Sequence, residues 1–211
     1  MNEYDLIVSI GDWCGPAHNI RRFFGVEESY PFDWWITPYE ATIKLLNSNF
    51  EGMLNPANLV IEDNSTVRCT TYGLLHHHDF ERDDNDLIKP DIDQQINHVY
   101  AKTYRRIQRL LDNTKDKEVL FVRSNLWNEG VCAEGEELRA RVDVFYDALL
   151  MRYSHCRRLD LLVLAPLEPE IISRPTGRVI VRPLGERIGS AFFWDDNYDA
   201  VFNSLGIKLK H

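Results

Sequence analysis

The chain has 211 residues, 44% of them hydrophobic, which is enough to bury one sizeable core. Its formal net charge of -9 and its pI near 5.3 exclude a broad basic surface, so we expect no nucleic-acid partner. The first apolar run is short and follows Glu3 and Asp5, unlike a signal peptide or a membrane span. We therefore expect a cytoplasmic protein with no membrane association.

The first apolar run, Asp5–Ile10, predicts a strand that is buried on both faces. Gly11–Gly15 is then its exit loop, Pro16 opens a helix, and Gly25 ends that helix.

A second helix is expected through Leu46. Thr37 can cap it, Pro38 fits its first turn, and Glu40 can complete a capping box. The stretch after it is less regular. Residues 65–80 could hold a strand and its loop, and residues 81–91 form an acidic surface segment.

Strands and helices alternate in the rest of the chain. Apolar runs predict strands at Glu118–Val122, at Leu159–Ala165 and from Arg178 onward. Apolar stripes at helical spacing run from Ile92 to Leu110 and from Leu138 to Tyr153, and a last helix from about Asp195 to Leu205 ends at Gly206. This alternation predicts a single α/β domain over residues 1–211. We expect a three-layer, Rossmann-like (flavodoxin-like), mostly parallel sheet with helices on both faces.

The cysteines do not form a framework. Cys14, Cys69, Cys132 and Cys156 are scattered without CxxC spacing, so reduced thiols are expected, with neither a disulfide framework nor a zinc site. There is no Gly-x-Gly-x-x-Gly or Walker loop either, and we predict no metal and no other cofactor.

Cys14 has the position of a nucleophile. At the carboxyl end of a parallel strand and beside a helix N-terminus, free N–H groups and the helix dipole favour a thiolate at neutral pH. Gly15 lets the backbone come close to a substrate. The alternative is a small, half-buried hydrophobic side chain, as most free cysteines are.

A nucleophilic cysteine needs an imidazole beside it. The run His76, His77 and His78 offers one, and if it stays extended His76 and His78 share a face. The alternative for this run is a solvated loop or an adventitious metal-binding surface. His18 is a further candidate, because it follows Cys14 by four residues and can lie on the same helix face.

Two further side chains leave alternatives open. Trp34 packs in the core or stacks on a sugar ring or an apolar group. Arg123 binds an anionic substrate group or forms a structural pair with Asp12 or Asp33.

Several of these motifs occur together in one family. The block "ISxGxxC" around Cys14, "SYPFDWW" at Ser29–Trp35, "HDF" at His78–Phe80 and "FVR" at Phe121–Arg123 resemble a bacterial domain of unknown function that is described as a putative papain-like cysteine peptidase. The resemblance implies Cys14 as nucleophile and His78 as base, with Asp33 or Asp79 orienting the imidazole. The papain signature itself and its two-lobed fold are not evident in this sequence.

A weaker resemblance is to SGNH (GDSL-type) hydrolases, whose nucleophile follows the first strand of a three-layer α/β fold. The sequence has Gly11-Asp12 and then Trp13, so the nucleophile would be displaced by one residue to Cys14. The likeness suggests Asn125 or Asn128 as an oxyanion donor.

We therefore predict a cysteine-dependent hydrolase or acyl transferase acting on a peptide, amide or ester, in which N–H groups around Gly15 and Asn125 hold the oxyanion. The alternative is a non-catalytic module that binds a sugar or an anionic ligand in the same cleft, for example in surface-polysaccharide biosynthesis. The expected partners are thus a small molecule, a peptide or a glycan. The sequence does not fix the oligomeric state.

Overall fold

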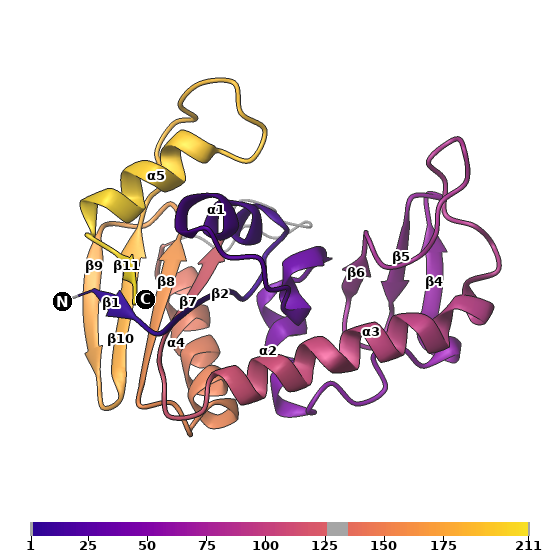
Figure 1. The fold of residues 1–211 in the computed structure, drawn as a ribbon, viewed down its shortest axis with the longest axis horizontal. Coiled ribbons are helices and arrows are strands. Elements are labelled where there is room, and N and C mark those ends of the chain that lie inside the picture. Colours follow the sequence, from indigo (N-terminus) through magenta and orange to yellow (C-terminus); the bar gives the residue numbers. More distant parts are fainter. Residues whose placement is uncertain (1, 126–134, 211) are drawn as a thin grey trace.

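The structure is a computed structural model that describes residues 2–125 and 135–210. Its main sheet has the strand order β2-β7-β8-β10-β9 (Figure 1). The bounds are β2 Leu6–Ser9, β7 Glu118–Ser124, β8 Arg158–Leu164, β9 Glu170–Arg174 and β10 Gly177–Arg182. The first four strands in this order pair in parallel, and only the edge strand β9 is antiparallel. The predicted α/β fold with a mostly parallel sheet is confirmed.

Helices pack against the residues of these strands. They are α1 Gly15–Phe24, α2 Tyr39–Asn47, α3 Ile92–Asn113, α4 Gly135–Arg152 and α5 Asp195–Ser204. Along β7, Leu120 shares a buried cluster with α1 and α5, whereas Phe121 shares another with α2, α3 and α4. Successive strand residues are thus buried on opposite sides, which explains why the strand sequences are continuously apolar. None of the helices in the described ranges is long and apolar enough to cross a membrane.

A second, antiparallel sheet was not predicted as such. Its order is β3-β6-β5-β4, with β3 Trp35–Ile36, β4 Leu59–Glu62, β5 Thr66–Cys69 and β6 Leu74–His76. Two short 3-10 helices, η1 Pro31–Trp34 and η2 Pro56–Asn58, precede β3 and β4. The long helix α3 runs past both sheets (Figure 1), and its apolar face shares one buried cluster with residues of each. One core therefore joins the two sheets.

The helix ends test the capping predictions. Gly25 ends α1 in the left-handed region, with φ 67°, and Gly206, with φ 59°, follows the last residues of α5, as predicted. The capping box predicted for α2 is wrong. Pro38 is the N-cap residue, and no side chain caps the helix. Thr37 is instead fully buried, its N–H bonding to the Asp12 carbonyl, and Glu40 pairs with Arg141.

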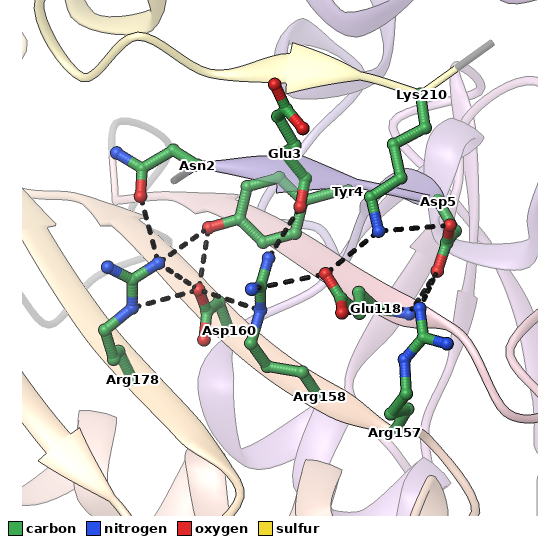
Figure 2. A network of polar contacts seen from close by, with 10 residues as sticks. All are labelled: Asn2, Glu3, Tyr4, Asp5, Glu118, Arg157, Arg158, Asp160, Arg178 and Lys210. Carbon is green, nitrogen blue, oxygen red and sulfur yellow. Dashed lines mark hydrogen bonds and ion pairs between the residues drawn. The ribbon is translucent and has the colours of Figure 1, made fainter.

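A network of charged groups ties both chain ends to the main sheet (Figure 2). Strand β1, Glu3–Tyr4, pairs in parallel with β11, Lys208–Leu209. The Tyr4 hydroxyl donates to Asp160 of β8 at 2.7 Å, and Arg178 of β10 donates to the same carboxylate oxygen at 2.6 Å. Lys210 lies 3.0 Å from Glu118, at the start of β7. The chain ends therefore lie at the amino-terminal edge of the parallel strands.

Gly11, in the exit loop of β2, provides a test of how tightly this region packs. Its φ is +88°, and a Cβ there would lie 2.3 Å from Thr37 Oγ1 and 2.8 Å from Arg123 Nη1. We expect Gly11→Ala to lower the free energy of unfolding by more than about 2 kcal/mol, because strain and overlap add. Gly25→Ala is the matched control. Gly25 also has a positive φ but no atom near its Cβ position, so only about 1 kcal/mol should be lost. Equal losses in urea unfolding would contradict the packing argument.

Candidate functional site

Cys14 lies at the carboxyl edge of the main sheet. It follows the exit loop of β2 and is the N-cap residue of α1, with its carbonyl accepting the His18 N–H at 2.9 Å. Its side chain is half-buried. Gly15 is required next to it, because a Cβ there would lie 2.4 Å from the Trp13 ring. The close approach expected at Gly15 is thus made by a tryptophan of the same loop.

A cavity of about 350 Å³ opens beside Cys14. Aromatic rings form much of its wall: Trp13, Trp34, Trp35, Phe192 and Phe193. Its polar groups are Cys14, Ser65, Thr66, His77 and His78, and Ile36 and Leu75 complete it. The wall thus combines the start of α1, the small sheet and the segment before α5. It has no aspartate, glutamate, lysine or arginine among the described residues, so the cavity is neutral apart from its histidines.

The three adjacent histidines do not all face the cavity. Strand β6 ends at His76, so the run does not stay extended. His77 and His78 both line the cavity, with ring centroids 4.6 Å apart, and the His78 ring meets Trp34 edge to face at 5.6 Å. His76 is fully buried against Trp35 and Phe80. His18 turns toward Asp195, 3.3 Å away, and stacks on Phe193.

Asp79 bonds to residues of the small sheet and of α3, and no hydrogen bond joins it to His78 among the described residues. Its Oδ2 accepts from Trp35 Nε1 at 2.7 Å and lies 2.9 Å from His76 Nδ1. Its Oδ1 lies 2.9 Å from Lys102 Nζ of α3. Although burial opposes ionisation, these partners hold the pKa of Asp79 well below its usual range. A buried carboxylate with such partners locks β3, β6 and α3 together.

Asp33 bonds to residues of η1 and α1, and no hydrogen bond or ion pair joins it to a histidine among the described residues. Its Oδ2 accepts the Tyr30 N–H at 2.8 Å and the Arg21 guanidinium at 2.6 Å, so it caps η1 and pairs with α1. Burial raises the pKa of Asp33 to about 6, against the opposing effects of Tyr30 and Arg21.

Arg123 is buried and does not face the cavity. It donates to the carbonyls of Ile10 at 2.9 Å and Thr37 at 2.6 Å, and its guanidinium lies 4.1 Å from the centre of the Tyr39 ring. Among the described residues its partners are carbonyls, the Thr42 hydroxyl and aromatic rings, and no ion pair joins it to Asp12 or Asp33.

The remaining candidates lie beneath the site. Asp12 is buried and accepts the Ser124 hydroxyl at 3.3 Å, and the Asn125 N–H bonds to the Leu164 carbonyl at 2.8 Å. Neither residue is among those that line the cavity. Asn128 and Cys132 lie outside the described residues.

The pKa shifts favour the uncharged forms of the Cys14 thiol and of the His77 and His78 imidazoles. Burial raises the pKa of Cys14 above its ordinary value, which favours the protonated thiol. Burial, together with His77 and Arg82, lowers the pKa of His78. Among the described residues, no hydrogen bond joins Cys14 Sγ to a histidine nitrogen, and no cluster of three or more His, Cys, Asp or Glu could hold a metal.

Phe192 and Phe193 were missed in the sequence analysis, as were Trp13, Ser65 and Thr66. The adjacent phenylalanines in "SAFFWDD" are an aromatic pair in a loop, which is the signal that could have drawn attention to them. Nothing in the sequence indicates that this loop reaches back across the chain to Cys14, where Trp13 meets Phe193 with ring centroids 5.5 Å apart.

Residues 5–144 match the model of a family described as putative papain-like cysteine peptidase (DUF1796), a domain of unknown function. The match covers well over half of the chain, and the protein belongs to this family. It includes Cys14, the PFDW block and the HDF block. No curated protein and no solved structure matches the chain.

The opposite pKa shifts of Asp79 and Asp33 predict opposite effects on stability. The pKa of Asp79 is depressed in the folded state, so the unfolded chain binds its proton more readily, and folding loses stability below pH ~4. In Asp79→Asn, this acid-induced decline should be shallower than in the wild type.

The pKa of Asp33 is raised in the folded state, so wild-type stability should fall as pH rises from about 4 to about 6, and Asp33→Asn should remove that fall. Urea unfolding over pH 3–7 measures both slopes, and variants with the wild-type slope would contradict the assignment.

Proposed function

We propose that the protein is a cysteine-dependent hydrolase or acyl transferase in which Cys14 is the nucleophile and His78 is the base. The observation that carries this proposal is that Cys14 and His78, which are far apart in sequence, line one cavity. The family description as a cysteine peptidase supports the same chemistry. His77 is the rival base, because it lines the same cavity.

The charge states favour general-base catalysis over a preformed thiolate–imidazolium pair. A neutral His78 can accept the Cys14 proton as sulfur attacks the carbonyl carbon. The N–H groups of Cys14 and Gly15 would hold the oxyanion, since Pro16 has none to offer. His78 then returns the proton to the leaving group, and a thioester on Cys14 remains. Water or another acceptor then attacks the thioester carbonyl and loses a proton to His78. The carbon–sulfur bond breaks, and His78 returns that proton to the Cys14 sulfur.

The cavity wall defines the acyl group that it accepts. Burying a charge without a partner is costly, and the described wall offers aromatic rings and neutral hydrogen-bonding groups only. The substrate is therefore a peptide, amide or ester whose acyl side is uncharged and apolar. Trp34 Nε1 is a buried donor without a partner in the described parts of the chain, and it would donate to a substrate oxygen.

A three-layer architecture of the SGNH type is part of this proposal. Its support is that Leu120 and Phe121, neighbours in β7, join separate helix-containing clusters. A nucleophile after the first parallel strand is also the arrangement that this likeness implies.

The second candidate is a binding module that uses the same cavity without chemistry. The raised pKa of Cys14 favours it, because a protonated thiol is a poor nucleophile. Its ligand would be neutral, since the wall offers no lysine or arginine in the described ranges to bind an anion. Substitution of Cys14 distinguishes the two candidates.

We expect Cys14→Ala to abolish turnover of a p-nitrophenyl ester with an aromatic acyl group, and Cys14→Ser to retain only a trace. His78→Ala should lower kcat by about 10² or more, because proton transfer is lost. His77→Ala is the matched control. A smaller loss in His77→Ala would support His78 as the base, and the reverse order would assign the base to His77. Full turnover in Cys14→Ala would contradict the proposal.

The pKa of Cys14 predicts its alkylation profile. The iodoacetamide reaction rate, followed by mass spectrometry of the Cys14 peptide, should still rise with pH above about 8.5, the value of an unperturbed thiol. A rate that is already at its plateau at pH 6 would show a preformed thiolate and contradict the general-base mechanism. The same measurement on His78→Ala shows whether the imidazole assists the reaction.

A further inference from the structure

A second cavity, of about 380 Å³, lies between one face of α3 and the loop that follows α2. The helix contributes Tyr100, Thr103, Tyr104 and Gln108, and the loop contributes Glu51 and its neighbours. None of the described residues that line it also lines the cavity at Cys14. The two cavities are therefore separate binding volumes.

Two exposed tyrosines dominate the helix side of this cavity. Tyr100 and Tyr104 are one helical turn apart, and their rings are nearly parallel, at 12°, with centroids 6.1 Å apart. They are 57% and 51% exposed, whereas most large apolar side chains of the protein are buried. Neither hydroxyl has a hydrogen-bond partner in the described parts of the chain. The pair therefore leaves exposed aromatic surface and two hydroxyls available at the cavity wall.

A buried polar atom in the wall indicates that the cavity is built for a polar ligand. Thr103 is only 2% exposed, and its Oγ1 has no hydrogen-bond partner among the described residues. A threonine within a helix usually returns this bond to a carbonyl one turn earlier, so the orphaned hydroxyl is unusual. The side chains of Gln108 and Glu51 likewise have no hydrogen bond to the described residues, and they line the same volume.

We propose that this cavity binds a neutral saccharide. A pyranose ring has an apolar C–H face that packs on an aromatic ring, and hydroxyls at its edge that hydrogen-bond to amide, carboxylate and hydroxyl groups. The rings of Tyr100 and Tyr104 would pack against the C–H face of the sugar. The side chains of Gln108 and Glu51 would hydrogen-bond to the hydroxyls at its edge.

The charge of the wall disfavours anionic ligands that stack on aromatic rings. Glu51 repels anions, and no lysine or arginine is among the described residues that line the cavity. A nucleotide or an acidic sugar would need such a cation for its phosphate or carboxylate.

Isothermal titration with cellohexaose, with chitohexaose and with the anionic hexagalacturonate tests the proposal. At least one of the two neutral oligosaccharides should bind with a Kd in the millimolar range or below, and hexagalacturonate should not bind. Tyr104→Ala should weaken binding by about tenfold or more, and Tyr104→Phe, the matched control, should stay within about threefold, because the ring supplies most of the contact. Thr103→Val should weaken binding without lowering the free energy of unfolding, because it removes an unsatisfied buried hydroxyl.

The proposal would be overturned by no saturable binding of either neutral oligosaccharide at millimolar concentration, by unchanged affinity in both Tyr100→Ala and Tyr104→Ala, or by equal affinity for hexagalacturonate. Both tyrosines are exposed, so their substitution should leave the fold intact, and circular dichroism checks this. Cys14→Ala should bind the oligosaccharide as the wild type does. A loss in that variant would place the saccharide in the cavity at Cys14 and also overturn the proposal.

Discussion

The candidate site depends on one buried cation. Arg123 lies at the carboxyl edge of β7 and is 1% exposed, yet no carboxylate within the described ranges forms an ion pair with it. Its guanidinium N–H groups donate to the carbonyls of Ile10 and Thr37. The guanidinium also lies over the rings of Tyr39 and Phe145. A guanidinium tolerates this environment because it is weakly hydrated and planar. By holding Ile10 and Thr37 at once, Arg123 fixes the exit loop that leads to Cys14 against the start of α2.

In the small sheet, Asp79 connects β3, β6 and α3. It gathers Trp35, His76 and Lys102 around one carboxylate, and the two residues just before it, His77 and His78, enter the cavity. The nucleophile candidate thus belongs to the parallel sheet, and the base candidates belong to the antiparallel one. The distance between them depends on how the two sheets pack through their shared core, and no element brings thiol and imidazole together by itself.

The sequence predicted those elements that have a long apolar pattern or a characteristic residue at their end. The apolar strands of the main sheet, the stripe of α3 and the end of α1 at Gly25 are of this kind. The small sheet was not predicted as such. Its strands are two to four residues long, and most of them lack the continuous apolar run that marks the equally short β2. The roles of Asp33 and Asp79 depend on partners that only the fold supplies: Arg21 for one, and Trp35 and Lys102 for the other. Cys14 and His78 could be named from sequence, but their charge states could not, since burial sets them.

The pairing of β1 with β11 has a consequence for how this chain can be rearranged. Its first and last strands lie side by side and are held by Asp160 and Glu118 (Figures 1 and 2). Cys14 follows the carboxyl end of β2, at the other end of the parallel strands. A short linker could therefore join Asn2 to Lys210, and the chain could be opened instead in the exposed loop at residues 83–87. The circularly permuted molecule would keep both cavities, because neither is lined by residues of β1 or β11. Its connectivity would change while its binding surfaces stayed the same.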